Sequence, residues 1–297
     1  MGTIAEFDVE HLIGLQVGTS TIVKELARGG MAIVFVAFQR TLKRQIAVKL
    51  LPKSLLTPKT AELFQQEAEA AAILSHSNII PVYEVGETED FLFFTMQLVH
   101  GNPLSHYMKA AQKNPIPSRR VLPVAASVNI GIQVLDALNY AHTQDIVHRD
   151  IKPGNIMIEK HSNRPLVMDF GIVQVMRSKS DDKPIVHGTP LYMAPEQILS
   201  RDVDGRADIY AVATMFFQML VAKLPLPPFK SKPALLKEKV LNKNGIFLQW
   251  PSEVNPDLHE DMDPILQKAL AYSPDDRYAT CKDFQDDLIA YQKNHLT

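Results

Sequence analysis

Two short segments in a fixed order constrain this chain more than any other feature. The first is Val-His-Arg-Asp-Ile-Lys-Pro-Gly-Asn at residues 147–155, and the second is Met-Asp-Phe-Gly at residues 168–171. A lone His-Arg-Asp would mean little, but the longer string followed by the second segment has a negligible probability of arising by chance. The chemistry they bring together is a carboxylate at Asp150, a cation at Lys152, and hard oxygen ligands at Asn155 and Asp169.

The composition describes an ordinary globular chain. Its 297 residues are 46% hydrophobic and 22% charged, which allows a sizeable core in one large domain or two smaller lobes. Lys and Arg (31) nearly balance Asp and Glu (33), so no basic field favours nucleic acid or an anionic membrane. Cys281 is the single cysteine and the N-terminus does not resemble a secretory signal, so we expect a cytoplasmic protein.

Short runs rich in β-branched and aromatic residues dominate the first third of the chain. They predict an antiparallel sheet interrupted by a helix from Pro58 to Ser75. The predicted strands are Thr21–Leu26, Ile33–Phe38, Gln45–Leu51, Ile80–Val85 and Phe91–Gln97.

The pattern becomes helical after Gly101-Asn102-Pro103. An apolar stripe of helical period runs through Val128, Ile132, Leu135 and Leu138. The apolar stretch 210–222 is too short for the roughly 20 residues that span a bilayer, so it predicts a buried helix and no membrane segment in this chain. The proline-containing loops 112–123 and 223–233 are expected to connect helices.

The segments at 147–155 and 168–171 resemble the catalytic and metal-binding loops of the protein kinase family. The Gly-Gly-Met run at residues 29–31, the Ala-Pro-Glu-Gln run at residues 194–197 and the compact span 21–292 look most like bacterial kinases of the eukaryotic-like Ser/Thr type. This resemblance implies an α+β, bilobal protein-kinase-like fold, with a small antiparallel-sheet N-lobe that carries one helix and a larger, mainly helical C-lobe. The implied divisions are an N-terminal extension (1–20), a kinase domain (21–292; N-lobe 21–97, hinge 97–102, C-lobe 103–292) and a C-terminal tail (293–297).

The resemblance assigns roles to the first two segments. Asp150 would accept the proton of the substrate hydroxyl, and Lys152 would neutralise charge on the transferring γ-phosphoryl group. Asn155 and Asp169 would bind Mg²⁺, with Mn²⁺ as an alternative metal. For His148 we expect a packed, structural imidazole instead. The alternative, that these side chains only cap turns, explains the ordered set less well.

A strand lysine and a helix glutamate would complete the ATP site. Lys49 alternates in its predicted strand with Ile46 and Val48, which indicates a cleft-facing side chain. By resemblance Lys49 holds the α/β-phosphates, and Glu67 fixes it. Glu69 is the rival of Glu67, and the two point about 200° apart on a helix, so only one can face the cleft.

Residues 26–34 stand where the family has a Gly-x-Gly-x-x-Gly-x-Val loop, with Gly29 and Val34 at the ATP-binding positions. Ala27 and Ala32 replace the first and third glycines of that pattern. Because alanine restricts positive φ, this departure favours a stiffer loop and leaves a weakly active or inactive kinase as an alternative.

The adenine site would use one strand and the residues that follow it. Met96 resembles the gatekeeper, Ala47 lies among the ATP-binding residues, and the backbone of Gln97 and Val99 would bond the base. Many family members carry Glu at the position of Gln97, a change of little weight where backbone groups do the binding.

Gly-Thr-Pro-Leu-Tyr-Met-Ala-Pro-Glu at residues 188–196 resembles the end of the family's activation segment, a peptide-docking segment, and Thr189 with Lys152 indicates Ser/Thr specificity. A phosphate on Ser178 or Ser180 would find the cationic Arg149 beside the catalytic loop. Two structural residues complete the resemblance: Asp208 would brace the catalytic loop, and Arg277 would pair with Glu196 in a buried ion pair.

The sequence therefore predicts a transferase, a Ser/Thr protein kinase that uses ATP and Mg²⁺ on protein substrates and phosphorylates itself. Two alternatives remain: an ATP-binding pseudokinase that serves as a scaffold, and a small-molecule phosphotransferase of the same fold, which the docking segment 188–196 disfavours. No nucleic-acid partner is expected, and a homodimer is left open.

Overall fold

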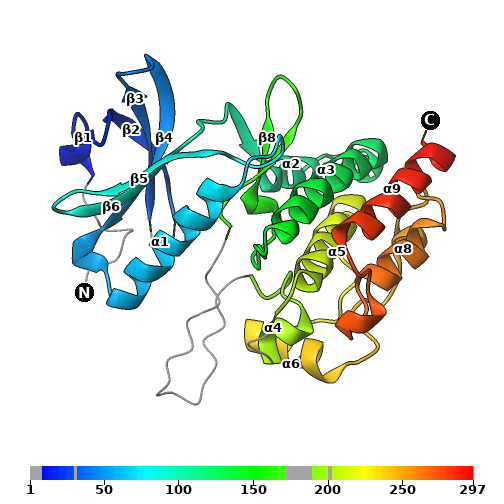
Figure 1. Cartoon of the computed structure of the whole chain (residues 1–297). Coiled ribbons are helices and arrows are strands. Elements are labelled where there is room, and N and C mark those ends of the chain that lie inside the picture. Colours follow the sequence, from blue (N-terminus) through cyan, green and yellow to red (C-terminus); the bar gives the residue numbers. More distant parts are fainter. Residues whose placement is uncertain (1–8, 30–31, 171–188, 200–202, 297) are drawn as a thin grey trace. The chain divides into compact units, whose positions relative to one another are not determined.

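The computed structural model describes residues 9–29, 32–170, 189–199 and 203–296, apart from the side chains of Lys59, Leu63 and Glu67. Within it the chain divides into two compact units, Met1–His100 and Gly101–Thr297. Figure 1 shows a sheet-rich first unit and a helix-rich second unit. The predicted extension, hinge and tail boundaries stay predictions.

An antiparallel sheet with strand order β1-β2-β3-β4-β6-β5 is the frame of the first unit. All five predicted strands are confirmed in position, although β5 begins two residues later than expected. It starts after Pro81, which has no N–H to donate to a ladder. The strands are β1 (Gln16–Val17), β2 (Ser20–Arg28), β3 (Ile33–Gln39), β4 (Arg44–Pro52), β5 (Val82–Glu87) and β6 (Phe91–Met96), with 3₁₀ turns η2 (Glu10–Leu12) and η3 (Lys53–Leu55).

Helix α1 (Pro58–Ile73) begins where the sequence predicts it. Thr57 and Thr60 cap each other: the Thr60 N–H donates to Thr57 Oγ1 (3.2 Å), and the Thr57 N–H donates to Thr60 Oγ1 (2.9 Å). Pro58 fits the first helical position, where no N–H is needed. Phe64 then packs on Phe94 of β6, with 5.2 Å between ring centroids, which fixes α1 against the sheet.

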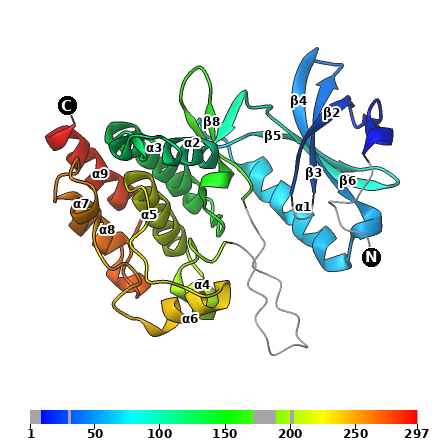
Figure 2. The ribbon, with the colours of Figure 1, turned by 180° about the vertical axis from the view of Figure 1, so that it is seen from behind.

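Helices make up most of the second unit, together with a small antiparallel sheet of order β7-β8-β9. Helices α3, α5 and α9 lie side by side in Figures 1 and 2, and nearly every residue of α5 is buried, as predicted for that stretch. The elements are β7 (Gly101–Pro103), α2 (Leu104–Gln112), η4 (Pro117–Arg119), α3 (Val124–Thr143), η5 (Pro153–Asn155), β8 (Ile156–Glu159), β9 (Pro165–Val167), α4 (Pro195–Leu199), α5 (Arg206–Leu220), α6 (Lys232–Leu241), α7 (Pro251–Val254), α8 (Met262–Ala269), η7 (Pro274–Asp276) and α9 (Cys281–His295).

Helix α3 carries the predicted apolar stripe. Val128, Leu135 and Leu138 are fully buried, and Ile132 is half-buried. Within the described ranges, residues 117–143 are also the one stretch long and apolar enough to cross a membrane. Because α3 packs against α5 and α9, its apolar side chains already have a protein core to fill.

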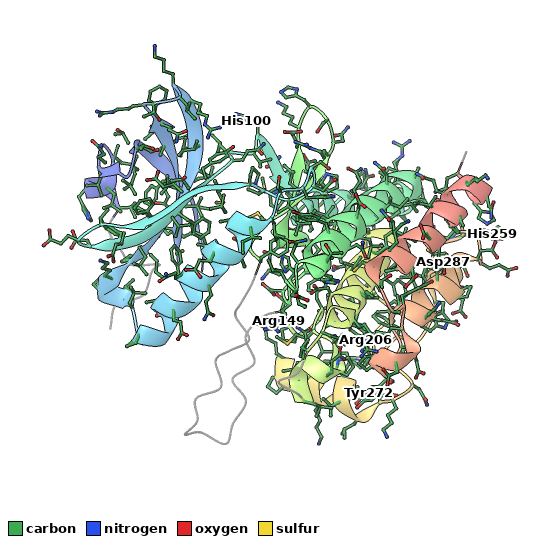
Figure 3. The ribbon with its side chains drawn as sticks, viewed as in Figure 1. His100, Arg149, Arg206, His259, Tyr272 and Asp287 are labelled. Carbon is green, nitrogen blue, oxygen red and sulfur yellow. The ribbon has the colours of Figure 1, made fainter. Side chains whose placement is uncertain are left out.

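The predicted ion pair between Arg277 and Glu196 is present in the second unit. Arg277 donates from both terminal nitrogens to the Glu196 carboxylate (2.7 and 2.8 Å), and its side chain is wholly buried. Its remaining donors bond the carbonyls of Ala271 (2.7 Å), Arg206 (3.0 Å) and Tyr272 (3.0 Å). Arg206 and Tyr272 lie near each other in Figure 3, so one guanidinium ties α4, the start of α5 and the residues after α8 together.

We expect Arg277→Met to lower the free energy of unfolding by about 3–5 kcal/mol, because it leaves a partly buried carboxylate and three carbonyls without their donor. Arg206→Met is the matched control, since its two ion pairs are with the exposed carboxylates of Asp204 and Asp275, and such surface pairs are worth under about 1 kcal/mol each. Urea unfolding of both variants measures the difference. Equal losses would contradict the assignment of Arg277 as the structural anchor.

Candidate active site

The sheet register places the predicted nucleotide-binding residues of the first unit on one face. Residues paired across antiparallel strands point to the same side, and the pairs are Val34 with Lys49, Ala47 with Met96, and Lys49 with Phe94. Ala47 and Met96 are buried, while Val34 and Lys49 are half-buried. This face therefore has an apolar floor with a cation at one end, which suits a base and its phosphates.

Lys49 lies above the Phe94 ring, with 5.3 Å from its Nζ to the ring centroid. Its predicted partner Glu67 belongs to α1, but the side chain of Glu67 lies outside the described part, so that pairing stays a prediction. The rival Glu69 is exposed and accepts a hydrogen bond from Gln65 (2.9 Å), a neighbour on its own helix.

The turn between β2 and β3 is closed at its base by the Gly29 N–H, which donates to the Ala32 carbonyl (2.8 Å). Ala27 pairs with Val34 in the β2–β3 ladder, and Ala32 is buried. Neither alanine has a positive φ, so neither position demands glycine in this backbone. The departure from the family pattern thus produces no backbone strain at these two positions; Gly30 and Met31 lie outside the described residues.

The predicted adenine-binding edge follows β6. The Gln97 N–H donates to the Pro81 carbonyl (3.1 Å), which fixes this peptide at the end of the sheet. Gln97 and Val99 are both half-buried, and their use as hydrogen-bonding edge for a base stays a prediction.

In the second unit, the catalytic loop brings Lys152 and Asn155 onto one oxygen of Asp150. Lys152 Nζ lies 2.5 Å from Asp150 Oδ2, and Asn155 Nδ2 donates to the same oxygen (3.2 Å) and to the Asp150 carbonyl (2.8 Å). Within the described part of the chain, no hydrogen bond reaches Oδ1 of Asp150. The carboxylate is 23% exposed, so it is oriented from one side and accessible from another.

The second predicted segment is tied to the first through a hairpin. Strands β8 and β9 pair, and beyond them the Met168 N–H donates to the Asn155 carbonyl (3.0 Å). Asp169 follows directly in a left-handed conformation with φ 57°. The hairpin thus brings the backbone before Asp169 to Asn155, as the two-segment pattern predicts.

These residues fit a hard divalent cation. Because Asn155 donates both hydrogen bonds from Nδ2, its amide orientation is fixed and its oxygen points away from Asp150. An amide oxygen and a carboxylate, with phosphate oxygens completing the shell, are the ligands that Mg²⁺ prefers.

His148 is the packed, structural imidazole that the sequence predicts. It is fully buried, its ring lies 4.7 Å from the Phe170 ring, and its Nε2 donates to the Met168 carbonyl (3.0 Å). Its Nδ1 accepts from the Asp150 N–H (3.3 Å). One tautomer, protonated at Nε2, satisfies both contacts and links the two segments.

Asp208, in the first turn of α5, holds the catalytic loop by its backbone. The Arg149 N–H donates to Oδ1 (2.7 Å), and the His148 N–H donates to Oδ2 (2.8 Å), which also bonds His142 Nε2 (2.8 Å). Burial acts to raise the pKa of Asp208, but the bond from His142 and the other donors outweigh it, so the pKa lies below its usual value. Gly205 has no side chain because a Cβ there would lie 2.5 Å from the His142 ring.

Only part of the predicted activation segment is described. Thr189 is exposed at its end, whereas Ser178 and Ser180 lie outside the described residues and stay predictions. Arg149, labelled in Figure 3, has a buried Nε to which the described part of the chain offers no acceptor. A cation there suits a phosphate, which supports the predicted role of Arg149.

The sequence did not identify three residues that the structure brings to this region. His142 pairs with Asp208; Gln197 donates to the Arg149 carbonyl (2.9 Å) and accepts from the Ala194 N–H (2.8 Å). Lys239 bonds the carbonyls of residues 191 and 193. Only Lys239 left a signal, since it follows Leu235 and Leu236 at helical spacing on an apolar face.

We expect Asp208→Asn to destabilise the protein by about 2–4 kcal/mol, because an amide cannot accept from both backbone donors and His142. The lowered pKa of Asp208 means that its carboxylate stabilises the fold above the usual Asp pKa and that this contribution is lost as pH falls through the folded value. Urea unfolding between pH 3 and 7 should therefore show a flatter acid branch in the variant. The exposed Asp286→Asn is the control, and an equal loss in both variants would contradict this role.

The chain matches the family described as protein kinase domain over residues 20–289. It is 33% identical to the serine/threonine-protein kinase Pkn1 of Myxococcus xanthus over 97% of the chain, and 35% identical to pkn3 of the same species over 96%. It is also 31% identical to the tyrosine-protein kinase MasK of Myxococcus xanthus, strain DK1622, over 94%. The chain spans only 40%, 52% and 44% of these three relatives, respectively.

Among solved structures, the kinase domain of Mycobacterium tuberculosis PknI aligns with a TM-score of 0.71 at 29% identity, covering 94% of this chain and 98% of that one. The predicted bilobal α+β fold and the predicted likeness to bacterial kinases are confirmed by these matches. The chain belongs to the protein kinase family.

Proposed function

We propose that this chain is a protein-serine/threonine kinase that transfers the γ-phosphoryl group of ATP to hydroxyls of protein substrates, and to its own. The observation that carries the proposal is the Asp150 carboxylate, which Lys152 and Asn155 orient through Oδ2 while no hydrogen bond from the described residues reaches Oδ1. A carboxylate held in this way can accept the proton that the attacking hydroxyl loses. The serine/threonine kinases among the relatives support the substrate class.

The neighbouring side chains supply what phosphoryl transfer needs besides a proton acceptor. Lys152, 28% exposed, can extend its ammonium to the γ-phosphoryl oxygens, where negative charge must be neutralised. Asn155 and Asp169 would hold Mg²⁺, or Mn²⁺ in its place, which when bound would neutralise charge on the β- and γ-phosphate oxygens. Because Asn155 also fixes Asp150, the proton acceptor and the metal ligand keep a constant position relative to each other.

ATP binding is assigned to the common face of β3, β4 and β6. Ala47 and Met96 offer an apolar surface to adenine, Gln97 and Val99 offer backbone groups, and Lys49 would bind the α/β-phosphates. Gly29 and Val34 would cover the phosphates, and Glu67 would orient Lys49. A cytoplasmic location and a role in signalling belong to the same proposal, and a homodimer stays a prediction.

The test is magnesium-dependent transfer of ³²P from ATP to a protein substrate and to the chain itself. We expect Asp150→Asn to reduce transfer by about 10³-fold or more, because removal of an oriented base or an aligning group typically costs several powers of ten. Asp145→Asn is the matched control: it makes the same chemical change five residues away, at an exposed position whose φ of 59° asparagine tolerates.

Two outcomes would overturn the proposal. Binding of ATP without any transfer by the unaltered chain would favour the pseudokinase scaffold. Equal rates in Asp150→Asn and Asp145→Asn would remove Asp150 from the chemistry. The alanines at 27 and 32 do not by themselves favour the scaffold, since both fit their backbone without strain.

A further inference from the structure

Lys239 of α6 is buried to an unusual degree for a lysine. It is 1% exposed, whereas the other lysines with described side chains are exposed or half-buried. A buried ammonium loses its hydration, which costs several kcal/mol unless protein groups replace it. The surroundings of Lys239 must therefore supply acceptors, and they show which part of the fold uses this charge.

The acceptors are two carbonyls of the docking segment that precedes α4. Lys239 Nζ bonds the carbonyl of Leu191 at 2.5 Å and that of Met193 at 2.6 Å, and it lies 4.9 Å from the centroid of the Tyr210 ring. These carbonyls are almost fifty residues from Lys239 in sequence. Helix α6 therefore holds a segment that no helix or strand of its own fixes.

The charged groups around Lys239 do not neutralise the charge of its ammonium group. Glu196 faces it from α4 but is engaged in the bidentate pair with Arg277, so the two nearly cancel. Burial lowers the pKa of Lys239 to about 7, with a further lowering by Arg277 and an opposing effect of Glu196. Tyr210 of α5 presents its ring face to Lys239. The Tyr272 hydroxyl donates to the carbonyl of Val240, the residue that follows Lys239. The titratable neighbours on α6 itself, Lys237 and Glu238, are exposed and half-buried.

The segment held by Lys239 also forms part of a groove. Leu191 lines a hollow of about 810 Å³ together with Gln218 of α5 and residues 222–224 and 226–229. The Tyr192 hydroxyl donates to Gln218 (2.6 Å), which joins the segment to α5 on the same side. A shift of the Leu191 backbone would therefore change the shape of this hollow.

We propose that Lys239 is a positioning residue that fixes the backbone of residues 191–193 and so the surface on which a protein substrate docks. The effect on substrate docking rests on the proposed kinase function, whereas the positioning of the segment rests on the two bonds from Lys239 to its carbonyls. Lys239 does not touch the reacting atoms; it acts through the segment.

Proton linkage gives the proposal a direction. When the segment is released, Lys239 reaches water and regains a pKa near 10.4, whereas in the held state the pKa is about 7. When the pH lies between these two pKa values, Lys239 therefore takes up a proton as the segment is released. Rising pH in this range favours the held state by up to about tenfold per pH unit. Below about pH 7 both states are protonated, and the opening equilibrium becomes independent of pH.

The kinetic test compares Lys239→Met with Lys237→Met, a change of the same kind at an exposed position of the same helix. We expect Lys239→Met to raise KM for the protein substrate about tenfold or more, because the two hydrogen bonds that fix the segment are lost, while KM for ATP stays unchanged. Lys237→Met should change neither constant. Equal increases in both KM values for Lys239→Met would mean a general structural role and would overturn the proposal.

Amide hydrogen exchange tests the geometry without any catalysis, so it separates this proposal from the proposed function. Corrected for intrinsic rates, opening of residues 191–194 should fall as pH rises from 7 to 9 in the unaltered chain and in Lys237→Met. In Lys239→Met it should be faster and independent of pH. If that variant does not fold, the profile of the unaltered chain decides: opening that does not fall over this range overturns the proposal.

Discussion

The catalytic loop depends on a buried carboxylate that has no solvent to share its charge. Asp208 must be surrounded by donors, and the nearest are the peptide N–H groups of His148 and Arg149, together with the His142 ring at the end of α3. Arg149 takes a left-handed conformation with φ 65°, which costs about 1–3 kcal/mol and which bonds to a charged acceptor can offset. The orientation of the next residue, Asp150, follows from this forced turn of the backbone.

Three buried charges of the second unit lie on helix α5 or against it. Asp208 lies in its first turn, and two residues later the Tyr210 ring lies between two cations, 5.0 Å from Arg277 and 4.9 Å from Lys239. The two cations differ in their compensation. Arg277 has a carboxylate partner and fills every donor, so it behaves as a fixed anchor; Lys239 has only carbonyl dipoles, so it is the one whose protonation can respond to pH near 7.

Local patterns predicted the fold because strands and helices here follow side-chain period and caps, as β5 shows: it was expected from Ile80, and Pro81 delays it. The catalytic loop was predictable because its chemistry lies in contiguous motifs. Gln197 and His142 were not, since their roles arise from contacts with backbone or side chains 48 and 66 residues away, which no local pattern encodes. Lys239 lay between these cases: helical spacing indicated burial, but its partners could not be read from the sequence.

Two of the groups that hold the docking segment and the helix after it differ in character. Gln197 joins the start of α4 to the Arg149 carbonyl through neutral hydrogen bonds, which do not depend on pH. Lys239 holds residues 191 and 193 through an amine whose charge can change. The first link connects the segment to the catalytic loop, and the second connects it to α6. If Lys239 releases its carbonyls, the Gln197 bond still holds α4 to the loop beside Asp150, so the proposed docking of a substrate can weaken while the proposed proton acceptor keeps its place.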